Sequence, residues 1–197
     1  MKKIMTIAAA ITVATLSSTA MAGDWFVGLE GGKANNKTSG YVEMQGGTPS
    51  LSDKKVKSKF YGVRVGKYID DNVRVYGSIS KNKFNDSDVK DLNQSGFGKV
   101  IKDQKSLMLS SDYVFMKDSS IRPFAGVSLG ASRIGFAGKN KTGLAYGAQA
   151  GVMFQAGPVD MEIGAKYIGN NAKVKHDGAE FKLKNSRQAY LSASYRF

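Results

Sequence analysis

The last ten residues of the 197-residue chain alternate strictly between apolar and polar side chains. In an extended strand they would form one apolar face and one polar face. The apolar face would carry Phe197, Tyr195, Ala193, Leu191 and Ala189, and the polar face Arg196, Ser194, Ser192, Tyr190 and Gln188. A soluble sandwich would bury the apolar face in a core. A transmembrane barrel would turn it to lipid and turn the polar face inward.

The first 22 residues have the pattern of a secretory signal peptide, which favours the barrel. Two lysines follow the first methionine, residues 4–16 are apolar, and Ala20-Met21-Ala22 is a small-residue cleavage site. An uncleaved anchor is the weaker alternative, because the apolar run is shorter than the roughly 20 residues that span a bilayer. We expect cleavage after Ala22 and one mature domain over residues 23–197.

Composition removes several other classes of protein. The chain has no cysteine, which excludes disulfides, a lipid-modified cysteine and thiolate metal sites. After residue 23 no apolar run approaches the length of a membrane-spanning helix, which excludes a helical membrane protein. A barrel is compatible with the mean hydropathy of −0.28, because only alternate residues of its strands face lipid.

The same alternation recurs along the chain and predicts eight strands. They are residues 24–33, 59–69, 73–80, 106–115, 121–132, 145–154, 159–167 and 188–197. Short turns and long polar stretches alternate between them, the polar stretches being 34–57, 82–104, 133–143 and 168–187. The prediction is an all-β fold: an eight-stranded antiparallel up-and-down transmembrane β-barrel with short periplasmic turns and long extracellular loops.

If valine and leucine face lipid, charged side chains of both signs face the lumen. They are Glu30, Arg64, Arg74, Asp112, Arg122, Asp160, Glu162, Lys166 and Arg196. Because an unpaired buried charge is costly, we predict a network of ion pairs that plugs the lumen. An eight-strand interior is just wide enough for side chains to fill. A narrow gated pore, opened by breaking one pair, is the alternative.

The excess positive charge lies in the long polar stretches and at the strand ends that flank them. The chain has a net charge of +13, and residues 33–59, 81–105, 132–143 and 168–187 hold 20 basic and 8 acidic residues. A cationic surface fits the phosphates of lipopolysaccharide, although simple solvation would also explain it. Adhesion to anionic host glycans or matrix proteins is a further alternative. Export and the lack of a recognition module argue against nucleic acid.

Catalysis has little support in the sequence. Barrel acylases, deacylases and proteases need a base near a nucleophile, or a carboxylate pair at the rim. The single histidine, His176, lies between Lys175 and Asp177 with no serine partner in a defined register. We predict no catalytic residue, no cofactor and no bound metal.

Three stretches resemble the small OmpA/OmpX-type outer-membrane β-barrel family, often labelled porin-like. They are residues 122–130, 160–167 and 195–197. The ending also resembles the signal by which bacterial outer-membrane barrels are recognised for assembly, with its positions at Leu191, Ala193, Tyr195 and Phe197. The resemblance implies a monomer in the outer membrane of a Gram-negative bacterium, in contact with its lipids and with the barrel assembly machinery. It implies no particular activity.

Overall fold

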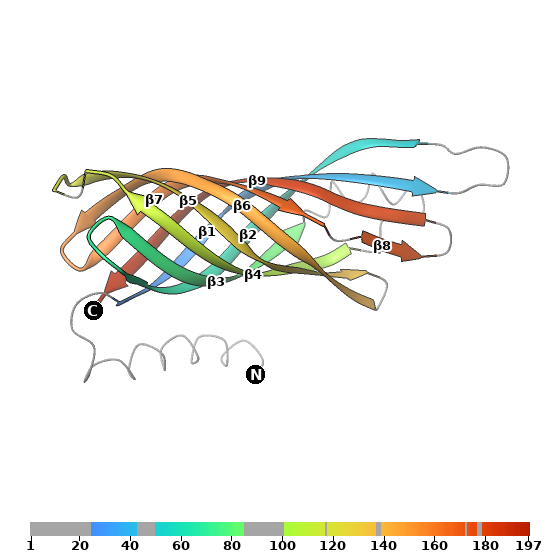
Figure 1. Ribbon diagram of the computed structural model, residues 1–197. Helices are drawn as coiled ribbons and strands as arrows, with labels where there is room; N and C mark the ends of the chain where they lie inside the picture. Colours follow the sequence, from blue (N-terminus) through green and yellow to red (C-terminus); the bar gives the residue numbers. More distant parts are fainter. Residues whose placement is uncertain are drawn as a thin grey trace, which may run out of the picture.

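The chain folds as a closed antiparallel β-barrel in a computed structural model (Figure 1). The structure describes residues 25–42, 50–84, 101–116, 118–136, 139–171, 173–176 and 179–197. The expected signal peptide and its cleavage site lie outside these residues. Within them, no helix is long and apolar enough to cross a membrane.

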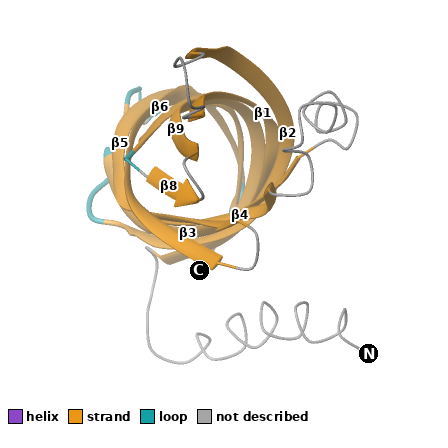
Figure 2. Cartoon of the chain, turned by 90° about the vertical axis from the view of Figure 1, so that its right-hand side faces the viewer, coloured by secondary structure: helices purple, strands orange, loops and turns teal. Residues whose placement is uncertain are grey.

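Each strand pairs antiparallel with the next along the chain. The strands are β1 (Trp25–Val42), β2 (Ser50–Tyr68), β3 (Val73–Phe84), β4 (Ile101–Val114), β5 (Ile121–Phe136), β6 (Lys139–Ala156), β7 (Val159–Asn170), β8 (Lys173–His176) and β9 (Ala179–Arg196). β1 also pairs with β9, which closes the ring seen end-on in Figure 2. β7 and the short β8 pair with different parts of β9. The barrel wall therefore consists of eight long strands, β1 to β7 and β9. The predicted eight-stranded up-and-down barrel is confirmed.

Three short connections lie at the same end of the barrel as the C-terminus (Figure 1). In the β2–β3 turn, Asp70 Oδ1 accepts hydrogen bonds from the backbone N–H groups of Asn72 and Val73, each at 2.7 Å. Gly157, in the β6–β7 turn, has φ of 60°, a conformation that glycine adopts without a steric penalty.

At the other end of the barrel the strands are longer than the sequence predicted. β1 continues to Val42 and β2 begins at Ser50, so most of the predicted 34–57 loop is paired strand. β3, β4, β5, β6 and β9 are extended in the same way. The predicted boundaries were wrong because they followed apolar alternation. Ladder hydrogen bonds continue beyond the hydrocarbon, where outward side chains need not be apolar. The remaining connections lie outside the described residues.

The two faces of the sheet differ as the barrel requires. Outward aliphatic side chains are well exposed, as at Leu29 (62%) and Leu191 (64%). Inward aromatic side chains are buried, as at Phe26 (1%) and Phe124 (2%). Because the aliphatic side chains do not pack against a second layer, a soluble sandwich is excluded.

Small inward residues let neighbouring strands approach each other closely on the lumen side. A Cβ atom on Gly130 of β5 would overlap the carbonyl oxygen of Leu107 and would stand 2.8 Å from the Cα of Met108. Gly77 of β3 faces outward, and a Cβ atom there would have nothing within 4 Å. The two glycines therefore differ in what the fold demands of them.

We expect Gly130→Ala to destabilise the barrel by about 1–3 kcal/mol, because the added methyl group meets backbone that cannot move away cheaply. Gly77→Ala is the matched control and should change stability by less than about 0.5 kcal/mol. Urea unfolding of both variants in lipid vesicles would measure the difference. Equal unfolding midpoints would contradict this account of packing at Gly130.

Candidate functional site

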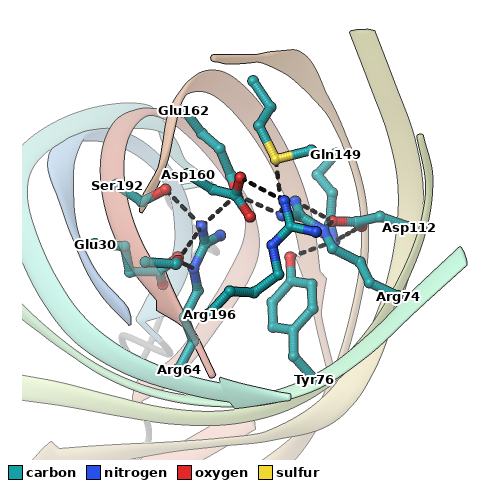
Figure 3. Close-up of polar contacts among 12 residues, drawn as sticks. Glu30, Arg64, Arg74, Tyr76, Asp112, Gln149, Asp160, Glu162, Ser192 and Arg196 are labelled. Carbon is teal, nitrogen blue, oxygen red and sulfur yellow. Dashed lines mark hydrogen bonds and ion pairs between the residues drawn. The ribbon is translucent and has the colours of Figure 1, made fainter. Parts of the chain in front are cut away.

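The centre of the lumen is a carboxylate shared by two arginines (Figure 3). Oε1 of Glu162, on β7, accepts hydrogen bonds from Arg64 of β2 and from Nη1 of Arg74 of β3, the latter at 2.5 Å. All three side chains are 0–1% exposed. β3 and β7 are four strands apart in either direction around the barrel, so the contact between Glu162 and Arg74 spans the lumen.

Each arginine is also held on its own side of the barrel. Arg74 donates from Nη2 and Nε to Oδ2 of Asp112, at 2.7 and 3.0 Å. Arg64 donates from Nη2 to the hydroxyl oxygens of Ser192 and Ser194, at 2.6 and 3.1 Å. The two guanidinium groups are therefore fixed in position as well as neutralised.

Two further ion pairs extend the network. Nζ of Lys166 lies 2.6 Å from Oε2 of Glu30, and Nη2 of Arg196 lies 3.1 Å from Oδ1 of Asp160. The hydroxyl of Tyr68 donates to Oδ2 of Asp160 at 3.0 Å. The ion pairs of the lumen thus include four basic and four acidic residues, so their formal charges balance.

Aromatic rings complete the packing around the cations. Cζ of Arg74 lies 4.9 Å from the ring centroid of Phe124 and 5.4 Å from that of Tyr76, which also lies 5.4 Å from Cζ of Arg64. Nζ of Lys166 lies 4.5 Å from the ring centroid of Tyr190. Cation–π contacts of this kind stabilise charge that has been removed from water.

Neutral residues that the sequence analysis missed link the network to the wall. Nε2 of Gln149 donates to Oδ1 of Asp112 at 2.6 Å and to the hydroxyl of Tyr76 at 2.9 Å. Ser128 donates to Oε1 of Gln149 at 2.5 Å. The alternation of the sequence already placed these residues on the inward face. Nothing in the sequence distinguished them from the other polar residues of the lumen.

Beyond the ion pairs the lumen contains buried amides and hydroxyls. Asn36 donates to Oγ of Ser58 at 2.9 Å. Asn82 donates to Gln104 at 3.2 Å, and Gln104 donates to Oγ of Ser132 at 2.6 Å. These five neutral residues come from the successive strands β1 to β5. The lumen is therefore lined by ion pairs in one part and by amides and hydroxyls in another.

The structure brings together eight of the nine charged residues predicted for the lumen. The exception is Arg122, whose Nε donates to the backbone carbonyl of Ser119 at 3.1 Å. Arg122 lies beside the β4–β5 turn, and within the described residues no ion pair to it is found. The four residues of the resembled assembly signal lie in or just after β9, where Leu191 and Tyr195 face outward.

No metal-binding group is found in the part of the chain that the structure describes. Within it, no group of three or more His, Cys, Asp or Glu residues could hold a metal ion. His176 ends β8 and pairs through its backbone with Ala179, and its side chain lies outside the described residues.

A closed ladder with an aliphatic outside and an ion-paired inside defines a transmembrane β-barrel. A family model described as "Outer membrane protein beta-barrel domain" matches residues 6–197, and the chain belongs to that family. It is a bacterial outer-membrane protein of the eight-strand OmpA/OmpX-like type, and the resemblance seen in the sequence is confirmed.

Several solved structures share the fold. The chain is similar to Neisserial surface protein A (NspA), with 19% identity and a TM-score of 0.60 over 89% of this chain and 99% of that one. It is similar to AlkL, with 18% identity and a TM-score of 0.53 over 92% and 93%. For OprH from P. aeruginosa the values are 22% and 0.51 over 89% and 100%. A search of curated proteins found no match.

We expect Glu162→Gln to destabilise the barrel by about 3–5 kcal/mol, because it leaves two buried arginines with one carboxylate fewer. Asp118→Asn makes the same chemical change at an exposed turn residue and should have an effect within about 0.5 kcal/mol. The free energy of unfolding in vesicles would be measured for both. If the two variants unfold alike, the shared carboxylate does not hold the lumen together.

Proposed function

We propose that this protein is a non-catalytic, non-conducting outer-membrane barrel with an envelope-structural or surface-interaction role, whose outer rim contacts lipopolysaccharide. The observation that carries the proposal is the contact of Glu162 with Arg64 and Arg74 across the lumen. A wall closed by β1 and β9 and an interior closed by ion pairs describe a protein that works through its surfaces.

The burial of the central charges supports a plugged lumen. Arg64, Arg74, Asp112 and Glu162 are each at most 2% exposed. A wide aqueous pore would leave such groups hydrated, because ions lose several kcal/mol when they are withdrawn from water without partners. The aromatic side chains of Phe26 and Phe124 occupy further lumen space.

The proposal includes two further steps, cleavage of the signal peptide and recognition of the C-terminal strand, which the structure does not test. Cleavage after Ala22 would release a mature chain beginning at Gly23, which N-terminal sequencing of the membrane-inserted protein would detect. The alternating residues Leu191, Ala193, Tyr195 and Phe197 would be read by the barrel assembly machinery. The mature barrel would act as a monomer.

We expect the purified protein to show no stable porin-like conductance steps in planar bilayers. Replacing both Arg74 and Glu162 with alanine should raise the ionic leak, because it removes the contact that spans the lumen. The variant Asp118→Ala, at an exposed turn residue, is the control for an effect of losing a charge elsewhere in the barrel. Stable, well-defined channels in the wild-type protein would overturn the plugged-lumen proposal in favour of the narrow pore.

Adhesion is the second candidate, because anionic glycans and lipopolysaccharide phosphates both complement a cationic rim. Intact expressing cells would be tested for binding to heparin-like glycans and matrix proteins. For a structural role we expect the binding of these cells to match that of cells lacking the protein. Strong, salt-sensitive binding, lost when lysines of residues 33–59 and 168–187 are replaced, would favour the adhesin.

A further inference from the structure

The outward face of the wall changes from apolar to cationic at the end opposite the C-terminus. On six of the eight long strands, the first outward-facing residue past the apolar residues, toward this end, is lysine or arginine. These residues, which we call the cation collar, are Lys33, Lys59, Lys81, Lys105, Arg133 and Arg187. The sequence analysis placed them at the ends of the predicted strands or beyond them, whereas the structure places all six on strands.

The collar brings like charges together in two places. Lys81, Lys105 and Arg133 are successive cross-strand partners on β3, β4 and β5. A second group lies where β9, β1 and β2 meet, beside the apolar hollow described below. Lys33 lies directly opposite Lys59 on β2 and opposite Ala189 on β9. Arg187 is two residues from Ala189 and is therefore a diagonal neighbour of Lys33. Like charges in such cross-strand positions destabilise a sheet, and a bound anion would relieve the repulsion.

An apolar hollow of about 660 Å³ lies on the lipid-facing wall below these cations. It begins at Gly31, one outward position from Lys33, and crosses β9 and β7 to reach Phe154 on β6. Gly31 is opposite Leu191, and Leu191 is opposite Ile163, so the hollow follows a row of paired residues. Its outward lining residues are Leu29, Gly31, Phe154, Met161, Ile163, Leu191 and Ala193.

We infer that Lys33, Lys59, Arg187 and this hollow form a binding site for the phosphorylated lipid A part of lipopolysaccharide. The inference rests on the proposed contact with lipopolysaccharide and assigns it to one seam of the wall. The cations bind phosphate, and the hollow holds an acyl chain. Lys33 and Gly31 are two residues apart on β1, so roughly 7 Å separates the cationic and apolar parts.

The two parts of the site distinguish its occupant from simpler ligands. Free phosphate would use the cations and leave the hollow empty. An unphosphorylated acyl chain would use the hollow and leave the repulsion between Lys33 and Lys59 in place. A lipid that carries phosphate directly above its acyl chains satisfies both parts.

Binding would be measured on the full mature chain in detergent micelles by native mass spectrometry. The ligands are bisphosphorylated lipid A, dephosphorylated lipid A, phosphatidylglycerol and pyrophosphate. We expect the triple variant Lys33→Gln, Lys59→Gln, Arg187→Gln to bind lipid A at least about tenfold more weakly, since three cations that attract its phosphate groups are lost. The matched variant Lys81→Gln, Lys105→Gln, Arg133→Gln should stay within about threefold of wild type.

A second pair of variants tests the hollow without changing charge. Gly31→Leu with Ala193→Leu would fill it, and the added Cβ at Gly31 has room, with 3.5 Å to the carbonyl oxygen of Phe60. We expect lipid A binding to weaken about fivefold and pyrophosphate binding to stay unchanged, because only the apolar contact is lost. Ala125→Leu with Ala150→Leu, exposed on β5 and β6, is the control and should bind as wild type does.

The outcomes separate this inference from the proposed function. Equal losses from the two charge variants, or from the two leucine variants, would overturn the seam site while leaving a contact with lipopolysaccharide intact. Equal binding of dephosphorylated lipid A would overturn the role of the cations. Wild-type binding of lipid A no tighter than that of phosphatidylglycerol would remove the proposed lipopolysaccharide contact itself. All variants would first be checked for folding by their heat-dependent mobility on gels.

Discussion

Backbone hydrogen bonding in a solvent without donors or acceptors is the constraint on which this structure depends. Each unsatisfied N–H or C=O group in hydrocarbon costs several kcal/mol, so a sheet in a membrane must close. The pairing of β1 with β9, from Phe26↔Arg196 to Val42↔Ala179, achieves this closure. Closure then creates an interior whose side chains are removed from both lipid and bulk water. The contents of that interior must therefore satisfy one another.

The ionic network meets much of this requirement by balancing its charges, but among the described residues Nη1 of Arg64, Oε2 of Glu162 and Nε of Arg196 have no hydrogen-bond partner. Buried ion pairs are weak evidence for stability, because desolvation offsets much of their attraction. Four cations and four carboxylates leave no net charge, and the hydroxyl oxygens of Ser192 and Ser194 accept further hydrogen bonds from Arg64. The rings of Phe124 and Tyr76 contact the guanidinium group of Arg74. The interior therefore carries no net charge from these pairs, and aromatic rings contact its cations.

Much of this could be predicted from alternation, because a period of two fixes the face of every residue in a strand. Glu162, Arg64 and Arg74 could be assigned to the lumen in this way. Their partners could not, since Arg74 pairs with both Asp112 beside it and Glu162 across the barrel. Arg122 was predicted to lie on the same inward face, but its side chain donates to a backbone carbonyl of the β4–β5 turn. Strand ends were missed because backbone pairing continues where apolar patterning stops.

Because side chains alternate between the two faces of a strand, one strand contributes residues both to the lumen and to the outer surface. On β2, Lys59 and Val63 face outward, whereas Arg64 faces the lumen. A register slip of one residue would turn Arg64 into lipid and Val63 into the ionic interior. The same slip would break the contact with Glu162 and move Lys59 out of the collar. Lumen charges, the apolar band and the collar therefore specify the same register, and each position in β2 is constrained from both faces of the sheet.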